Sequence, residues 1–217
     1  MNLLAVGLAR SIWLFQIAEW NPHGRAMHPV FFSLIEQYKF LKVPKLNEID
    51  WQKGVKFEDG TFKTEAGEEL TVTLTAYPDG VIADTRSSTQ DSDEFLNQAL
   101  SLISANFNYP DYQTVLRKKL YSSELYIRMQ QTLSDVHPDM MQFMNRLSSS
   151  VKNDSQIFRM GISFSSDPAI GGTTLAFRLE PAAGFPFSED RYYSIAPLQT
   201  DAHLRLLEEF EAIFLTK

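Results

Sequence analysis

The residues of this 217-residue chain that could take part in recognition chemistry follow a short apolar stretch at residues 81–83. They are Asp84, Arg86, Ser87, Ser88 and Asp91. A carboxylate and a guanidinium two positions apart at the end of a strand point to the same face. An arginine placed in this way can pair with a carboxylate or phosphate of a ligand. The sequence therefore predicts a recognition site at this point.

The same residues also fit a purely structural interpretation. Serine and aspartate are common helix caps, and a carboxylate in the first turn of a helix is favoured by the helix dipole. In this interpretation Asp84 pairs with Arg86 or caps the turn, while Ser87 and Ser88 compete for the helix cap. The sequence leaves both interpretations open.

A second candidate site is aromatic. The loop from Pro181 to Asp190 and the strand predicted after it carry four aromatic residues, which are Phe185, Phe187, Tyr192 and Tyr193. Exposed aromatic clusters are typical of protein interfaces. The alternative is that these side chains form a lid over a core. We expect an interface, with the lid as the competing prediction.

The known catalytic signatures are absent from the sequence. It contains no GxxxxGK[ST], HExxH or GxSxG motif. The four histidines have no metal-ligand spacing. The chain has no cysteine, which excludes disulfides, thiolate metal sites and a cysteine nucleophile. We therefore expect no catalytic centre, no bound metal and no cofactor.

The elements that would position these residues can be predicted from periodicity. Apolar residues at helical spacing predict a helix that runs to Phe107, after the caps. A further helix is predicted over Pro29–Phe40, with His28 as its cap, and strands over Ile12–Ala18 and Glu69–Tyr77. Asp59-Gly60 predicts a hairpin within residues 51–64.

The second half of the chain gives a similar series. It predicts strands at 124–129, 158–164, 174–179 and 192–196, and helices at 138–151 and 201–215. The first of these helices carries five large apolar residues, which are Met140, Met141, Phe143, Met144 and Leu147.

A shift of 111 residues brings the two halves into register. It places Thr89 on Thr200 and Leu96 on Leu207, and other matches keep nearly the same offset. Such a series predicts an internal duplication. The predicted fold class is α+β, a tandem pseudo-repeat at 1–108 and 109–217 packed as one compact unit. Each half reads β-α-β-β-β-α, with a mostly antiparallel sheet and helices on one face. The alternative is two unrelated α+β halves.

Composition favours a protein with packed cores and disfavours a nucleic-acid binder. Hydrophobic residues make up 44% of the chain, which is enough for packed cores. The net charge is −7, and the only dense basic run is Arg117-Lys118-Lys119, so nucleic-acid binding is disfavoured. Arg10 and Glu19 interrupt the apolar N-terminal stretch, which fits neither a signal peptide nor a membrane span.

These observations favour a non-enzymatic protein-interaction or assembly module built from a duplicated α+β unit. We expect it to be cytoplasmic, acting in a complex or as a homo-oligomer. The alternative is a small-molecule-binding protein or enzyme with a site between the two halves, using Asp84, Arg86 and His28 or His137. A third hypothesis is a nucleic-acid binder that uses the basic run.

Overall fold

Two compact units make up the chain. The computed structural model describes all residues except 46–48, 131–132, 134–137, 152–157, 172–174 and 216–217. One unit contains Leu8–Ser122 with Leu198–Thr200, and we call it the first-half unit. The other contains Met1–Gly7, Ser123–Pro197 and Asp201–Lys217, and we call it the second-half unit. His137, a residue of the alternative prediction, lies outside the described residues.

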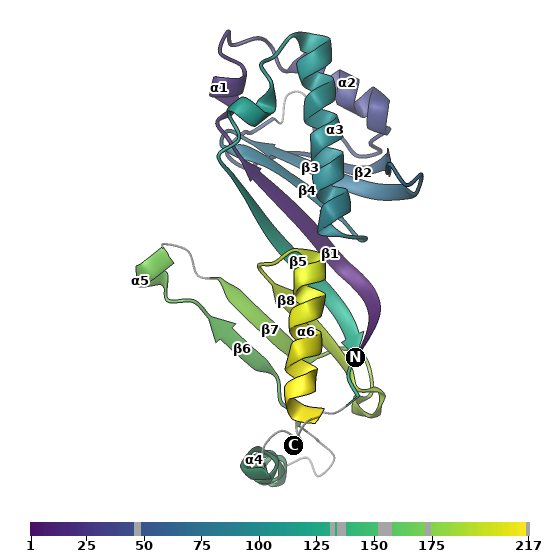
Figure 1. Cartoon of the computed structure of the whole chain (residues 1–217), viewed down its shortest axis with the longest axis vertical. Helices are drawn as coiled ribbons and strands as arrows, with labels where there is room; N and C mark the ends of the chain where they lie inside the picture. Colours follow the sequence, from purple (N-terminus) through teal and green to yellow (C-terminus); the bar gives the residue numbers. More distant parts are fainter. Residues whose placement is uncertain (46–48, 131–132, 134–137, 152–157, 172–174, 216–217) are drawn as a thin grey trace. The chain divides into compact units, whose positions relative to one another are not determined.

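The fold is mixed α+β with a large antiparallel sheet, as predicted (Figure 1). The strand order is β2-β3-β4-β1-β5-β8-β7-β6. The first elements are β1 (Asn2–Leu14), α1 (Ile17–Trp20), α2 (His28–Tyr38), β2 (Val55–Lys63), β3 (Glu69–Tyr77), β4 (Gly80–Thr85), α3 (Thr89–Phe107) and η2 (Tyr112–Thr114). They are followed by β5 (Lys118–Arg128), α4 (Pro138–Ser150), β6 (Ile162–Ser165), α5 (Pro168–Gly171), β7 (Ala176–Pro181), η4 (Phe187–Glu189), β8 (Arg191–Ala196) and α6 (Thr200–Leu215).

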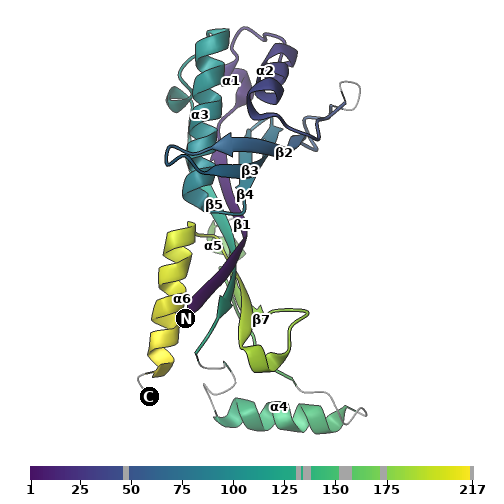
Figure 2. The same ribbon diagram turned by 90° about the vertical axis from the view of Figure 1, so that its right-hand side faces the viewer.

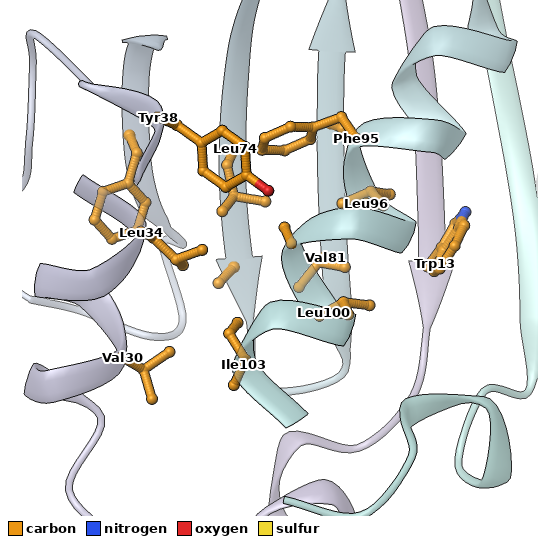
Figure 3. Packing of buried hydrophobic residues seen from close by; sticks show 14 of the residues in the cluster. Trp13, Val30, Leu34, Tyr38, Leu74, Val81, Phe95, Leu96, Leu100 and Ile103 are labelled. Carbon is orange, nitrogen blue, oxygen red and sulfur yellow. The ribbon is translucent and has the colours of Figure 1, made fainter. Parts of the chain in front are cut away.

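The first-half unit has a large, aromatic core between the sheet and the helices α2 and α3. Alternate residues of β3, including Val72 and Leu74, face this core, as period-two patterning predicts. Phe95 and Leu96 of α3 are fully buried, and Tyr38 of α2 packs edge-on against Phe95 at 4.8 Å between ring centroids (Figure 3). Helices α2 and α3 are therefore fixed against the strands by complementary packing.

The second-half unit has a smaller core. Its buried side chains come from β5, β7, β8 and α6, and include Leu125, Leu179, Tyr192 and Leu207. Helix α6 lies along the strands of this unit, as Figures 1 and 2 both show. Leu204 and Phe210 of α6 add partly buried contacts to the cluster. No residue of α4 belongs to this cluster or packs against it among the described side chains.

Two predicted elements in the first half are wrong. Strand β1 begins at Asn2, ten residues before the predicted start, because burial alternates through Ala9, Ser11 and Trp13 and makes the segment a strand. Asp59-Gly60 does not form a hairpin. It forms a bulge inside the single strand β2, with Asp59 at a φ of 55°. Gly60 is needed there because a Cβ atom would lie 2.4 Å from the Phe40 ring.

Two further predictions need correction. Met27, not His28, is the N-cap of α2, and it makes no side-chain capping bond; His28 is the first helical residue. Strand β6 runs over Ile162–Ser165, so it begins four residues after the predicted start of the 158–164 segment and ends one residue beyond it. It is paired with β7 from Ile162↔Leu179 to Ser165↔Ala176.

Candidate functional site

Three of the five predicted recognition residues form the N-terminal cap of α3. Ser88 is the N-cap, and its Oγ accepts a hydrogen bond from the Asp91 amide at 3.0 Å. The Ser88 hydroxyl in turn donates to Asp91 Oδ2 at 2.7 Å, and the Ser87 hydroxyl donates to the same oxygen. These side chains satisfy backbone and carboxylate groups locally, which is what the structural interpretation requires.

Asp84 and Arg86 are not paired with each other. The guanidinium of Arg10 on β1 donates two hydrogen bonds to the Asp84 carboxylate, from Nε to Oδ1 and from Nη2 to Oδ2, both at 2.7 Å. The register of β1 and β4 sets this contact because Arg10 lies directly opposite Asp84. Arg86 is exposed and has no hydrogen bond or ion pair among the residues that the structure describes.

The two phenylalanines of the aromatic loop, Phe185 and Phe187, are partly exposed, and an arginine lies over the ring of each. Phe185 is 41% exposed, and the guanidinium carbon of Arg191 lies 4.3 Å from its ring centroid. Phe187 is 36% exposed and carries Arg159 at 5.3 Å. Arg159 also pairs with Asp190 at 2.6 Å. Cation–π contacts therefore order these rings at the surface.

The two tyrosines of the aromatic candidate differ from one another. Tyr192 is fully buried in the core, and its hydroxyl accepts a hydrogen bond from the Leu133 amide at 3.1 Å. The prediction that Tyr192 offers an exposed interface is therefore wrong, because β8 turns this side chain inward. Tyr193 lies on the opposite face, 5.4 Å from the Tyr126 ring. Burial, followed by a hydrogen bond to Glu124, raises the pKa of Tyr193.

A buried histidine cluster was not predicted from the sequence. His203 of α6 is fully buried between two serines, with its Nδ1 2.8 Å from Ser123 Oγ and its Nε2 2.8 Å from Ser194 Oγ. Since the Ser194 hydroxyl donates to the Arg178 carbonyl, His203 Nε2 carries the proton. Burial lowers the pKa of His203 to about 4. No substrate can reach this imidazole, so its role is structural.

The basic run Arg117-Lys118-Lys119, at the start of β5, is largely neutralised by carboxylates of the same unit. Arg117 pairs with Glu19 at 2.5 Å, and the Lys119 ammonium lies 3.8 Å from Asp93 and 3.8 Å from the Trp13 ring centroid. Asp93 also accepts hydrogen bonds from the Trp13 indole and the Tyr121 hydroxyl. This pairing removes much of the positive field that phosphate backbones require.

The second-half unit carries an unusual number of exposed apolar side chains. Of the described large hydrophobic residues that are exposed, three lie in the first-half unit, namely Phe32, Leu41 and Val43. The remainder lie in the second-half unit, namely Leu3, Leu4, Met140, Met141, Phe143, Leu147, Phe164, Ile170, Leu175, Phe185, Phe187, Leu206 and Ile213. We call this second set the apolar surface of the second-half unit.

Helix α4 makes the densest contribution to the apolar surface. Met140 is 47% exposed, Phe143 62% and Leu147 37%, at a spacing that places them on one side of the helix. No described core side chain packs against the apolar residues of α4, so its apolar side is not covered by the described core of the unit. The helical spacing identified the helix, but spacing cannot distinguish a face turned to the core from one turned outward.

Comparison of the sequence with protein-family models and with curated proteins found no match. Among the described residues, no three or more histidine or carboxylate side chains are grouped so that they could hold a metal ion. No described helix is both long enough and apolar enough to cross a membrane. Functional inference therefore rests on the arrangement of the side chains themselves.

Proposed function

We propose that this chain is a non-enzymatic protein-interaction or assembly module that works in a cytoplasmic complex or as a homo-oligomer. The proposal is carried by one observation, which is the unequal burial of apolar side chains in the two units. Such a unit leaves many large apolar side chains in water. A partner that covers them lowers the free energy by about 25 cal/mol for each Å² of apolar surface removed from water.

The contrast between the two cores supports this proposal. Among the described residues, the buried cluster of the first-half unit contains twenty-three, whereas that of the second-half unit contains seven. The second-half unit has apolar residues in its sequence but places them at its surface, where a partner can bury them.

A protein partner fits α4 better than a lipid surface does. Helices that lie on membranes usually carry several basic residues on their polar face. The charged residues of α4 are Asp139 and Arg146, which cancel. Methionine side chains adapt to varied partner surfaces, and α4 offers Met140, Met141 and Met144. We therefore assign the apolar surface to protein contacts.

The proposal includes an internal duplication, which the pairing of strands supports. The first-half order β1-β4-β3-β2 corresponds to β5-β8-β7-β6 in the second half. Ala9 pairs with Thr85, and Ser123 pairs with Ala196. The corresponding residues of β4 and β8 are 111 positions apart, whereas those of β1 and β5 are 114 apart. Insertions between elements account for such a difference.

The experiment compares two phenylalanines with similar exposed fractions. Phe143 of α4 is 62% exposed and Phe32 of α2 is 58% exposed, so either can be changed to Gln with little effect on folding. The molar mass of the full chain is measured by light scattering across a concentration series. Binding to candidate partners is then measured with both components purified. We expect Phe143→Gln to weaken self-association or partner binding, and Phe32→Gln to leave both unchanged.

Two results would count against the proposal. The first is a wild-type chain that stays monomeric while its binding to every purified partner is the same with and without Phe143→Gln. The second is an equal loss of binding in the Phe32→Gln control, which would indicate a general effect of surface hydrophobicity rather than a specific surface.

A further inference from the structure

The outermost strand of the second-half unit has an edge that no described strand covers. Strand β6 pairs with β7 along one edge and stands last in the strand order of the sheet (Figure 1). The segment that contains it, residues 160–166, reads MGISFSS and has no charged residue and no proline. Three of the four residues of the strand are exposed. An uncharged, exposed strand edge is a template to which another strand can be added.

The strand at the other end of the strand order is protected against such pairing. Strand β2 carries four charged residues, which are Lys56, Glu58, Asp59 and Lys63. A bulge between Phe57 and Gly60 interrupts its ladder, and the backbone of Lys42 pairs with Glu58 along the edge that β3 leaves open. Charges, bulges and a covering segment are common ways in which proteins block an edge. Among the described residues β6 has none of the three, and only its length of four residues limits pairing.

The register of β6 shows which of its backbone groups face outward. The Ser166 amide donates to the Leu175 carbonyl, next to β7, at 2.8 Å. Because the bonding direction alternates along an antiparallel strand, Phe164 also directs its amide and carbonyl groups to β7. Ser163 and Ser165 therefore direct theirs away from the sheet, where no described residue bonds to them. These N–H and C=O groups are available to a further strand.

Phe164 ends an aromatic row that begins in the core of the unit. The ring of the fully buried His203 lies 6.1 Å from that of Phe177 on β7, measured between centroids. Phe177 lies opposite Phe164 in the strand register, and the two rings are stacked at 6.0 Å. Phe177 is partly buried against the core, whereas Phe164 is 59% exposed. The row therefore ends in a ring that the described part of the unit leaves uncovered.

We propose that β6 pairs antiparallel with β6 of a second copy of this chain, with Phe164 of both copies at the two-fold axis. The inference rests on the proposed interaction function and names its partner. Around this axis Ser163 of one copy lies opposite Ser165 of the other, so each outward N–H group meets a carbonyl of the second copy. Phe164 lies opposite Phe164 of the second copy in a non-hydrogen-bonded pair, the type in which side chains are closest.

A second copy suits this edge because self-pairing brings no like charges together. A strand that pairs with itself places residues of one segment opposite each other, and like charges there are destabilising. The uncharged segment avoids this in a chain with a net charge of −7. Arg178 of β7 lies opposite Ser163, and the proposed register places Ala176 of the second copy, not its Arg178, in the same row.

The aromatic row gives the second reason to choose a copy of the same chain. Aromatic rings are favourable neighbours at centroid distances of about 4.5–7 Å. Phe164 is the only aromatic residue of β6, and the ring that self-pairing places opposite it is another phenylalanine. The row then continues from the core of one copy to the core of the other, and both exposed rings become buried.

The test is a charge swap at Phe164, with the molar mass of the full chain measured by light scattering across a concentration series. We expect the wild-type chain to dimerise. Phe164→Lys and Phe164→Glu should each weaken the dimer at least about tenfold, because each replaces an aromatic pair with two like charges directly opposite each other. An equimolar mixture of the two variants should recover dimers, because opposite charges then face each other. A residue far from the two-fold axis would not show this recovery.

Phe32 provides the matched control. It is 58% exposed on α2, so Phe32→Lys and Phe32→Glu add the same charges at a similarly exposed ring and should leave the dimer unchanged. Ser165→Pro removes an outward N–H group from each copy but no hydrogen bond to β7, and it should weaken the dimer while keeping Phe164. Thermal unfolding of dilute samples should be nearly unchanged in the Phe164 variants, because substitutions of exposed side chains have small effects on stability.

Several outcomes would overturn the proposal. One is a wild-type chain that stays monomeric at every concentration; binding of another purified protein through α4 would then still support the wider interaction function. Others are a mixture of the charge variants that stays monomeric and an equal loss in the Phe32 variants. A dimer that is lost in Phe143→Gln but kept in every Phe164 variant would also overturn the pairing of β6 and assign the contact to α4.

Discussion

Thr89 and Thr200 hydrogen-bond to each other at the start of two helices, and this contact gives a sharp prediction. The Thr89 amide donates to Thr200 Oγ1 at 3.0 Å, and the Thr200 amide donates to Thr89 Oγ1 at 2.9 Å. Thr89 is fully buried and Thr200 is 3% exposed. Each hydroxyl therefore satisfies a buried N–H group for which water is not available as a substitute.

Thr200→Val removes the hydroxyl but keeps the shape of the side chain. It leaves the Thr89 amide buried without an acceptor, which costs about 1–3 kcal/mol of unfolding free energy. For a chain of this length, each kcal/mol lowers the melting temperature by roughly 2–4 °C. Thr200→Ser keeps an oxygen in place and should lose much less. Thr89→Val should behave like Thr200→Val, since the two bonds are reciprocal.

The assay is chemical and thermal unfolding of the wild-type chain, the three single variants and the double valine variant. A double-mutant cycle then gives the coupling between the two threonines, which are in contact and need not be additive. If Thr200→Val and Thr200→Ser both unfold within about 0.5 kcal/mol of the wild-type chain, as ordinary surface substitutions do, the reasoning about the buried amide is wrong.

Five other substitutions test further features of the fold. Leu96→Ala and Leu207→Ala remove fully buried side chains and should each cost about 2–5 kcal/mol in urea unfolding. Burial lowers the pKa of His203 to about 4, so as the pH falls the histidine binds a proton in the unfolded state before it does so in the folded state. The free energy of unfolding should therefore decline as the pH falls from about 6.5 to 4. His203→Gln should flatten this part of the plot of stability against pH. Arg86→Ala should leave the melting temperature unchanged. Arg10→Ala should lower the free energy of unfolding by about 1 kcal/mol, because the bidentate pair of Arg10 with Asp84 is partly exposed. A large loss of stability in Arg86→Ala would refute the assignment of Arg86 to a free surface position.

Periodicity predicted the elements well where one face of an element is buried. Strand β3 has the predicted bounds, and α3 begins at the predicted caps. The hairpin at Asp59-Gly60 was wrong because a dipeptide with positive φ also suits a bulge, and the Phe40 ring that requires Gly60 comes from a distant part of the chain. Local sequence patterns do not contain that tertiary contact.

The predicted recognition site shows the same limit. Residue types at Ser88 and Asp91 fit both a cap and a site, and the geometry of the α3 N-terminus shows that they cap. The partner of Asp84 is Arg10, seventy-four residues away in sequence, and only the strand register brings the two together. Arg86 remains a hypothesis for recognition, since its side chain is exposed and no described residue pairs with it.

The helices α2 and α4 offer the clearest argument for where function lies. Both follow the first strand of their half, so under the proposed duplication they descend from one ancestral helix. Helix α2 buries Val30, Phe31 and Leu34 in the core of its own unit. Helix α4 keeps an apolar stripe but exposes it. Exposed apolar groups do not stabilise the folded chain, so folding alone does not require them. A partner that covers the stripe gives these residues a role, which is why the interaction proposal rests on α4.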